Sequence, residues 1–430
     1  MIAVAPALAP RAWQGGWREG LAYGSLGLPL AFVALPLYVV LPAHYATAYG
    51  VPLAALGAVL LGARLLDAFV DPFIGRWADA LFDRSARRAW VTLGAASLLV
   101  AAGLHALFHP AVETGAALLW WCAVGLAVTY LGYSVAAVIH QAWGARLGGD
   151  ETQRARIVAW REGLALAGVL MASVLPSLAG LTATSVSVAA LLVLGVAGLW
   201  LAPRPLAHAG TSVRAASLAL PWGEARFRRL LAIYLCNGIA GAIPATLVLF
   251  FVRDRLQAPA FEPLFLGTYF AAAALALPLW VRLVARIGLA RTWLAAMLLS
   301  VAAFGWASQL GSGDVAAFAV VCMASGIALG ADLTLPGAML TGEIQRAGHA
   351  QRAEGAYFGW WNFATKLNLA LAAGLALPAL QVLGYAPGAR DAAALDALTL
   401  AYCLLPCALK LGAAALLLRG WIRIDEETPR

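Results

Sequence analysis

The stretch PRPLAHAGTSVRAASLALPWGEARFR, residues 203–228, divides the chain into two parts of similar length. It carries four arginines and three prolines and is the longest polar connection in a chain that is otherwise mostly apolar. On both sides of it, apolar runs follow one another with short connections, and about 20 apolar residues are what a helix needs to cross a bilayer. The sequence therefore predicts a polytopic membrane protein whose two halves are joined by this linker.

The composition of the whole chain indicates the same class. Hydrophobic residues make up 63% of the 430 residues and charged residues only 12%, whereas soluble proteins have roughly 45–50% and about 25%. A disordered chain and a disulfide scaffold are both excluded, because the chain is apolar and its five cysteines all lie inside apolar runs. The net charge of +8 does not indicate nucleic-acid binding, since the basic residues lie in the connections between spans.

Twelve candidate spans follow along the chain. They are residues 20–42, 52–81, 90–108, 115–143, 157–179, 185–202, 229–252, 262–285, 292–309, 315–341, 355–380 and 398–419. We expect an all-α polytopic membrane protein with twelve transmembrane helices, built as an N-terminal six-helix bundle (1–202), a cytoplasmic linker (203–228) and a C-terminal six-helix bundle (229–430). Two such halves are the layout of major-facilitator transporters, whose halves are parallel repeats.

The arginines predict the orientation of the chain. If the N-terminus is cytoplasmic, most arginines fall in cytoplasmic connections, and the opposite face has only Arg253, Arg255 and Arg390. The positive-inside rule then places both termini in the cytoplasm. Many Ala and Arg residues with only two lysines are typical of a GC-rich bacterial genome, which predicts the bacterial inner membrane.

The second span carries acids where lipid would be expected. Arg64, Asp67 and Asp71 recur at i, i+3 and i+7, and Gly75 extends the same helical face. A charge inside a span costs about 2.5–3.5 kcal/mol on insertion scales and so marks a functional position. Asp67 and Asp71 can ligate one Na⁺ together or share a proton, because two like charges this close do not readily coexist. The alternative is a structural ion-pair cluster in which Arg64 neutralises Asp67 and Asp71 caps a helix kinked at Pro72.

The end of this span has the Gly-x-x-x-Asp pattern followed by arginines that is typical of the loop gate of major facilitators. Gly75, Asp79 and Arg84 carry the pattern here. We expect these residues to close the cytoplasmic side through ion pairs, without touching the substrate.

The eleventh span holds Lys366, one of the two lysines of the chain. It lies about twelve residues, or ~18 Å, into the helix, and shares a face with Gly355, Gly359 and Asn362. A buried lysine needs a partner or a lowered pKa, and the two acids of the second span are the natural partners. The alternative is that Lys366 snorkels to one surface of the membrane.

Other residues inside spans are candidates for lining a substrate cavity, and these are Arg64, His140, Arg161, Asp332 and Trp361. Alternatives remain open for three of them. Arg161 is equally consistent with an ion pair to Glu162 at a helix end. A lone histidine such as His140 is more often a packed core residue. Asp332 is consistent with protonation, a substrate contact or a hydrogen bond to Lys366 or to a kinked backbone. Lys410 in the last span is expected at the interface or facing lipid, without a role.

Two strings resemble the signatures of the glycoside–pentoside–hexuronide:cation symporters, the melibiose-carrier family of major facilitators. These are RLLDAFVDPFIG at 64–75 and RAEGAYFGWWNFATKL at 352–367, and the loop DETQRARIVAWR at 150–161 is a looser third match. The resemblance implies a major-facilitator fold and Na⁺- or H⁺-coupled uptake. It further implies that Asp67 and Asp71 are the cation-site carboxylates, that Lys366 and Asn362 lie beside that site, and that Arg161 is the cavity arginine.

The chain departs from this family at two places. Sugar-transporting members have an acid in the first span and another in the fourth, both on the sugar, whereas the regions GSLGLPLA (24–31) and YSVAAVIH (133–140) have none. Sugar hydroxyls are best bound by carboxylate acceptors, so this departure keeps a second substrate class open. Eukaryotic relatives of the family include lysolipid transporters, which makes an amphipathic solute the main competing substrate.

The hypothesis is a cation-coupled secondary symporter of a small solute, with a sugar or glycoside as the candidate, working by alternating access. The alternatives are a lysolipid transporter on the same scaffold and a non-transporting receptor or assembly protein. An enzyme is not expected, because no nucleophile–base pair, metal cluster or phosphate loop is found in the sequence. The expected partners are the solute, the coupling ion and the bilayer, with no nucleic acid and no cofactor beyond that ion; we expect a monomer.

Overall fold

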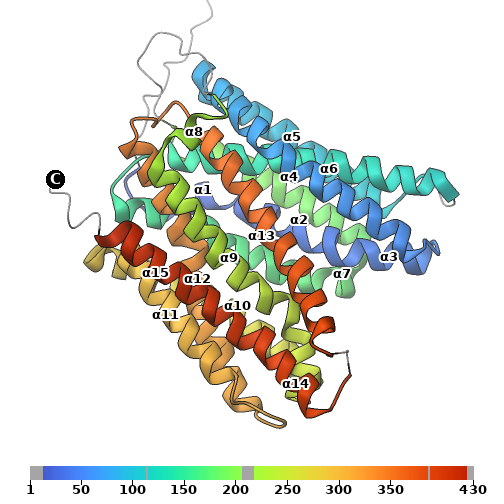
Figure 1. Ribbon diagram of the computed structural model, residues 1–430. Coiled ribbons are helices and arrows are strands. Elements are labelled where there is room, and N and C mark those ends of the chain that lie inside the picture. Colours follow the sequence, from blue (N-terminus) through green and yellow to red (C-terminus); the bar gives the residue numbers. More distant parts are fainter. Residues whose placement is uncertain (1–12, 113–114, 206–216, 386–387, 424–430) are drawn as a thin grey trace, which may run out of the picture. The chain divides into compact units, whose positions relative to one another are not determined.

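The computed structural model is built from helices in every part of the chain that it describes, which comprises residues 13–112, 115–205, 217–385 and 388–423 (Figure 1). The chain divides into two compact units. The first unit runs to Leu218 and also includes Ile344–Gly359, and the second contains Ala219–Glu343 and the residues from Trp360 onward.

Up to residue 205, the described residues of the first unit form seven α-helices. They are α1 (Trp17–Gly24), α2 (Gly27–Leu35), α3 (Leu41–Ala48), α4 (Leu53–Arg84), α5 (Ala86–Phe108), α6 (Gly115–Ala145) and α7 (Glu151–Leu201). A π-helical turn, Pro36–Val40, joins α2 to α3, so the first predicted span is one run of helix with two irregular points. Prolines at 36 and 42 explain the second irregular point, since proline removes a backbone donor from the helix.

The second unit begins at the short helix α8 and ends with α15. Its helices are α8 (Leu220–Gly223), α9 (Ala225–Phe250), α10 (Glu262–Ile287), α11 (Leu289–Ala307), α12 (Val315–Arg346), α13 (Glu354–Val382), α14 (Ala392–Thr399) and α15 (Leu405–Leu417). Short π- and 3₁₀-helical segments lie at Phe251–Arg255, Pro259–Phe261, Leu400–Leu404 and Leu418–Ile422. The end of α12, the start of α13 and the turn between them belong to the first unit.

The prediction of an all-α membrane protein is confirmed. Among the described residues, nine helices are long and apolar enough to cross a membrane. The other three predicted spans correspond to α1–α3, to α4 and to α13. The fifth and sixth predicted spans are joined without a connecting loop in α7, which breaks at Gly180 (φ 81°, ψ 175°). Glycine adopts this positive φ at little cost, so the turn between the two spans needs no further residues.

Helices of the first unit pack closely where glycine faces a neighbouring backbone. A Cβ atom at Gly24 would lie 2.6 Å from the carbonyl oxygen of Trp160 on α7, and one at Gly27 would lie 2.6 Å from that of Arg161. Small residues at such crossings let two membrane helices approach, because packing rather than hydrophobic burial holds helices together in lipid.

The core of the second unit is aromatic at one end. Phe251 stacks on Tyr402 with ring centroids 4.3 Å apart, and Phe265 meets Phe318 edge to face at 4.8 Å. The predicted boundaries of the linker at 203 and 228 stay a prediction, since residues 206–216 are outside the described part of the chain.

Candidate functional site

The two acids of the second span lie one turn apart on α4, and both are buried. Asp71 is fully covered, and Asp67 exposes 8% of its surface. The Ser134 hydroxyl on α6 donates a hydrogen bond of 2.6 Å to Asp67 Oδ1. Helices α4 and α6 thus bring three oxygen-bearing side chains into one buried region, whereas Arg64 on the same helix is exposed.

The stripe that carries Asp71 is also where α4 meets the start of α13. A Cβ atom added to Gly75 would lie 2.0 Å from the Gly355 carbonyl oxygen, and one added to Gly359 would lie 2.6 Å from the Asp71 carbonyl oxygen. Neither distance can be accommodated without moving a backbone. The glycines therefore fix the approach of α13 to the acid-bearing part of α4.

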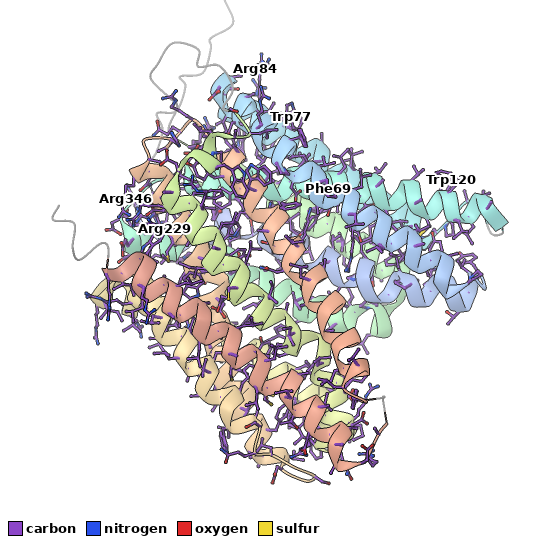
Figure 2. All side chains as sticks on the ribbon, viewed as in Figure 1. Phe69, Trp77, Arg84, Trp120, Arg229 and Arg346 are labelled. Carbon is purple, nitrogen blue, oxygen red and sulfur yellow. The ribbon has the colours of Figure 1, made fainter. Side chains whose placement is uncertain are left out.

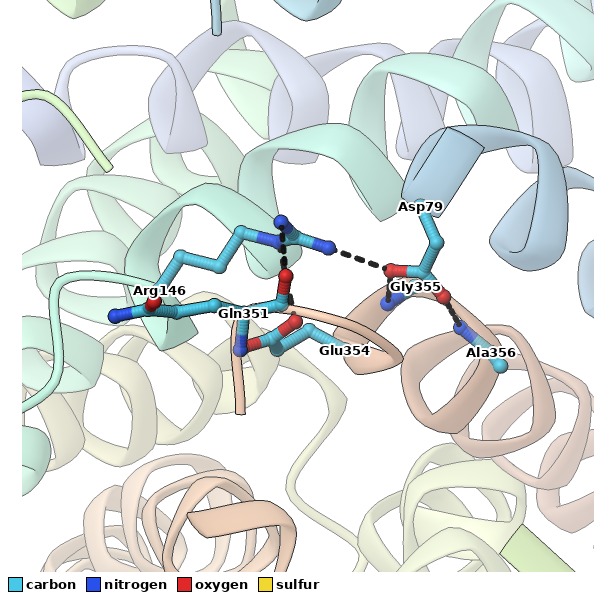
Figure 3. Close-up of polar contacts among 6 residues, drawn as sticks. All are labelled: Asp79, Arg146, Gln351, Glu354, Gly355 and Ala356. Carbon is cyan, nitrogen blue, oxygen red and sulfur yellow. Dashed lines mark hydrogen bonds and ion pairs between the residues drawn. The ribbon is translucent and has the colours of Figure 1, made fainter. Parts of the chain in front are cut away.

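Asp79, one turn beyond Gly75, caps the first turn of α13. Its Oδ1 accepts the Gly355 N–H at 2.7 Å, and its Oδ2 accepts the Ala356 N–H at 2.8 Å (Figure 3). The first N–H groups of a helix have no partner within the helix and carry the positive end of its dipole, so a carboxylate there is favourable.

Arg146 connects this cap to a second acid. Its Nη2 lies 3.0 Å from Asp79 Oδ1, and its Nε lies 3.1 Å from Glu354 Oε2. Its Nη1 donates to the Gln351 carbonyl oxygen at 3.1 Å, so one guanidinium holds α4 and the turn before α13 together (Figure 3). The three charged side chains expose 3% or less. Arg84, the arginine predicted for this gate, ends α4 with an exposed side chain, and it is Arg146 that pairs with Asp79.

His140 and Arg161 meet around Tyr23. His140 Nε2 lies 2.8 Å from the Tyr23 carbonyl oxygen, and the Tyr23 hydroxyl donates to the His140 carbonyl oxygen at 3.2 Å. Arg161 pairs with Glu162 at 2.7 Å, and its side chain lies near the Tyr23 phenol. The structure thus contains both the reciprocal core bonding of His140 and the Arg161–Glu162 pair that the sequence left open. It brings the two predicted cavity residues into one polar cluster.

Asp332 on α12 is bound by three side chains. Lys410 Nζ lies 2.7 Å from Oδ2, while Asn237 Nδ2 and Trp293 Nε1 donate to Oδ1 at 3.0 and 2.8 Å. Lys410 also donates to Asn237 Oδ1 at 2.9 Å. The expectation that Lys410 faces lipid or the interface is wrong, because this lysine is only 4% exposed. The neighbouring acid on α12, which is distant in sequence, accounts for its burial.

Helix α13 continues into the second unit with the remaining predicted residues. Trp361 is buried and stacks on Tyr234 of α9 with centroids 3.9 Å apart, and the Tyr234 hydroxyl hydrogen-bonds Thr365 at 2.7 Å. Asn362 and Lys366 are half-buried. The pairing of Lys366 with the acids of α4 stays a prediction.

A further polar cluster lies at the end of the second unit that holds the turn before α14. The Tyr385 hydroxyl and the Gly388 N–H (2.9 Å) both donate to Asp254 Oδ2, and Arg390 Nη1 donates to the Asp254 carbonyl oxygen at 2.9 Å. Burial and the bonded carboxylate raise the pKa of the Tyr385 phenol well above its ordinary value, so the phenol stays a donor at neutral pH. These contacts tie Tyr385, Gly388 and Arg390 to the π-helical segment Phe251–Arg255 that follows α9.

Sequence reasoning assigns no role to Ser134, Arg146, Glu354 or Asn237. In the sequence, Arg146 counts only toward the orientation of the chain, and Glu354 is one letter of the second signature string. Glu354 can be recognised in the sequence as an acid at the first position of a predicted helix. Its partner Arg146 cannot be recognised, because it lies 208 positions away. Within the described residues no group of three His, Cys, Asp or Glu side chains is placed to hold a metal ion.

Long apolar helices that bury acidic and basic side chains are typical of polytopic membrane transporters. The family model described as "MFS/sugar transport protein" matches residues 22–426, and the chain belongs to that family. This is a family of transporters, in agreement with the expectation that the chain is not an enzyme.

The "Inner membrane symporter YicJ" of Escherichia coli (strain K12) is 30% identical to this chain over 157 residues. The match covers 36% of this chain and spans about a third (33%) of that relative.

Solved structures confirm the fold. A bacterial homologue of the iron transporter ferroportin in an outward-facing state superposes with a TM-score of 0.69 at 17% identity, covering 94% of this chain and 98% of that chain. The transporter FucP in the outward conformation gives 0.67 at 14% identity, with coverage of 92% and 98%. The human organic anion transporter MFSD10 gives 0.62 at 18%, with coverage of 93% and 99%.

Proposed function

We propose that this transporter is a symporter that couples the uptake of a small solute to Na⁺ or H⁺, with a sugar or glycoside as the candidate solute. The observation that carries the proposal is the buried Asp67–Asp71 pair with Ser134 beside it. Two carboxylates this close in a membrane helix are costly as free anions. A bound cation or a shared proton offsets that cost, and Na⁺ is a hard ion that suits carboxylate and hydroxyl oxygens.

The cluster of Asp79, Arg146 and Glu354 fits the role of a cytoplasmic gate. In alternating access one bundle moves largely as a rigid body against the other. A gate must therefore hold the helices together when it is closed and release all of its contacts together when it opens. Asp79 holds the start of α13 through two N–H bonds, Arg146 bridges Asp79 to Glu354 at the first position of α13, and Gly75 sets the helix spacing beside them. Separating α13 from α4 would break all of these contacts at once.

We further propose that both termini lie in the cytoplasm, as the distribution of arginines predicts. The inner-membrane location named for YicJ supports a bacterial inner-membrane protein.

The solute class is supported by the family and by aromatic and basic side chains. The family description names sugar transport. Trp361, stacked on Tyr234, offers the kind of aromatic face on which sugar rings pack, and Arg161 with Tyr23 offers hydrogen-bond donors. The role of Lys366 and Asn362 beside the cation site rests on the sequence resemblance.

The decisive experiment measures the thermal stability of purified wild type, Asp71→Asn and Asp83→Asn against Na⁺, Li⁺ and pH. Asp83→Asn is the control, because it removes an exposed acid from the same helix. A ligand that binds only the folded protein raises its stability by mass action, by about 2.7 kcal/mol at 100 times Kd. We expect a Na⁺- or pH-dependent rise in wild type and Asp83→Asn that is absent from Asp71→Asn. If all three variants respond alike, Asp71 is not the coupling site.

The solute is then identified in the presence of the coupling ion. Wild type is melted with a panel of sugars and glycosides and, separately, with lysolipids. A sugar that raises stability only with the ion present supports symport of a sugar, and a response to lysolipids alone replaces the sugar by an amphipathic solute.

A further inference from the structure

The first unit has an apolar groove on a face of α4 other than the one that carries Asp71 and Gly75. The groove encloses about 510 Å³, and its walls come from α4, α5 and α6. Its lining is almost wholly apolar and consists of Val70, Phe73, Ile74, Trp77, Thr92, Ala95, Ala96, Leu99, Leu131, Gly132 and Val135. Two of its largest side chains, Phe73 and Trp77, remain 62% and 46% exposed. In a membrane protein such a surface is in contact with lipid.

One end of the groove is basic. Arg84 follows Trp77 by seven residues on α4, and Arg88 precedes Thr92 by four on α5, so each arginine continues the helical stripe that lines the groove. Both arginines are exposed. Figure 2 shows Phe69, Trp77 and Arg84 in succession along α4, with Arg84 at the end of the helix. The helical stripes that line the apolar trough therefore continue, beyond one end of it, into two exposed arginines.

The dimensions fit half a bilayer. From Val70 to Arg84 the helix rises about 21 Å, at 1.5 Å for each of 14 residues. Half of a bilayer, headgroups included, is about 20–22 Å thick. Trp77 lies between Val70 and Arg84 along the helix. An indole is favoured at the boundary between lipid headgroups and acyl chains. A lipid with its acyl chain against Val70 and Leu99 would have its phosphate at Arg84 and Arg88.

We propose that this groove is a binding site for an anionic phospholipid of the leaflet at the arginine end. The acyl chain fills the trough, and the headgroup phosphate is bound by the two guanidinium groups, which match phosphate oxygens in geometry and charge. The site depends only on the membrane location of the chain and not on which solute is transported. It also gives a role to Arg84, which takes no part in the ion pairs around Asp79.

The test counts bound lipids by native mass spectrometry of detergent-purified protein titrated with phosphatidylglycerol or phosphatidylcholine of the same acyl chains. Arg84→Ala/Arg88→Ala removes the phosphate contacts. Arg282→Ala/Arg286→Ala is the matched control, because it removes two exposed arginines from the end of α10, outside the groove. Ala95→Trp fills the trough, and Leu98→Trp is its control, since Leu98 is 70% exposed on α5 and does not line the groove.

We expect wild type to bind phosphatidylglycerol at least about tenfold more tightly than phosphatidylcholine, as two arginines near a lipid surface predict. The Arg84/Arg88 variant should lose this preference and the Arg282/Arg286 variant should keep it. Ala95→Trp should lose the tightest-bound lipid, and Leu98→Trp should retain it. Equal binding of the two lipids by wild type, or equal loss in the two arginine variants, overturns the proposal. Loss in both tryptophan variants also overturns it.

Discussion

Asp79 and Arg146 form a 3.0 Å ion pair whose two side chains expose 0% and 3% of their surface. The pair does not stand alone, because Glu354 takes a second nitrogen of the same guanidinium and two N–H groups of α13 bind Asp79. A buried ion pair is stabilising only when the remaining donors and acceptors are also satisfied. Here the first turn of α13 supplies two N–H donors to the carboxylate of Asp79.

Replacing Arg146 should therefore be severe. Arg146→Met leaves Asp79 and Glu354 buried without their shared cation, and we expect a loss of about 3–5 kcal/mol of stability. The measurement is thermal or chemical unfolding of the detergent-purified variant. Arg286→Ala, an exposed arginine of α10, should stay within about 0.5 kcal/mol of wild type.

A second variant distinguishes the ion pair from a general packing loss at this position. Arg146→Met combined with Asp79→Asn and Glu354→Gln removes the stranded charges and should recover part of the stability. If the single and triple variants melt at the same temperature, the three charges do not interact as the geometry indicates.

Two glycines of α4 should respond in opposite ways to alanine. In an open helical position, Gly→Ala is expected to stabilise by up to about 1 kcal/mol. A Cβ atom added to Gly62 would meet no atom of a neighbouring helix within 4 Å among the described residues, so Gly62→Ala should follow that rule. Gly75→Ala would place a methyl group 2.0 Å from the Gly355 carbonyl oxygen and should lower the melting temperature. Equal effects of the two substitutions would mean that α4 and α13 are not in contact at Gly75.

The parts of the site that follow one helix were predictable from sequence. Asp67, Asp71, Gly75 and Asp79 lie at spacings of four, which place them along one side of a helix whatever that helix packs against. The span positions were predictable for a similar reason, since about 20 apolar residues suffice to cross the bilayer. Local periodicity thus identified the acid-bearing helix and its end.

The partners of those residues were not predictable, because they come from distant helices. Asp79 meets Arg146 across 67 positions, and Arg146 meets Glu354 across 208. Lys410 was misplaced for the same reason, since a lysine in an apolar run faces lipid or protein according to what a neighbouring helix offers. One sequence without its contacts does not contain that information.

Ser134→Ala tests the cation site without changing its charge. The substitution removes the hydroxyl that donates to Asp67 at 2.6 Å, and a hydrogen bond to a charged group is worth about 1.5–3 kcal/mol. We expect the apparent affinity for the coupling ion, measured as the ion concentration that gives half the thermal shift, to fall about tenfold. Ser97→Ala is the control, because Ser97 is a buried serine on α5 that is not part of this cluster. An unchanged affinity in Ser134→Ala would exclude the hydroxyl from the ion site.

The Asp332–Lys410 pair gives a prediction for the second unit. Lys410→Met should cost about 3–5 kcal/mol, because it removes the cation from Asp332 and leaves that acid with only the neutral donors Asn237 and Trp293. Lys410→Met with Asp332→Asn removes both charges, and we expect it to melt close to wild type, since a buried pair is often replaceable by neutral side chains. With Asp332→Asn alone, the three proteins and wild type complete a double-mutant cycle measured by thermal unfolding. A coupling energy near zero would mean that the 2.7 Å contact contributes nothing to stability. If instead the double variant is stable but no longer transports, the pair acts in the transport cycle rather than in holding α12 to α15.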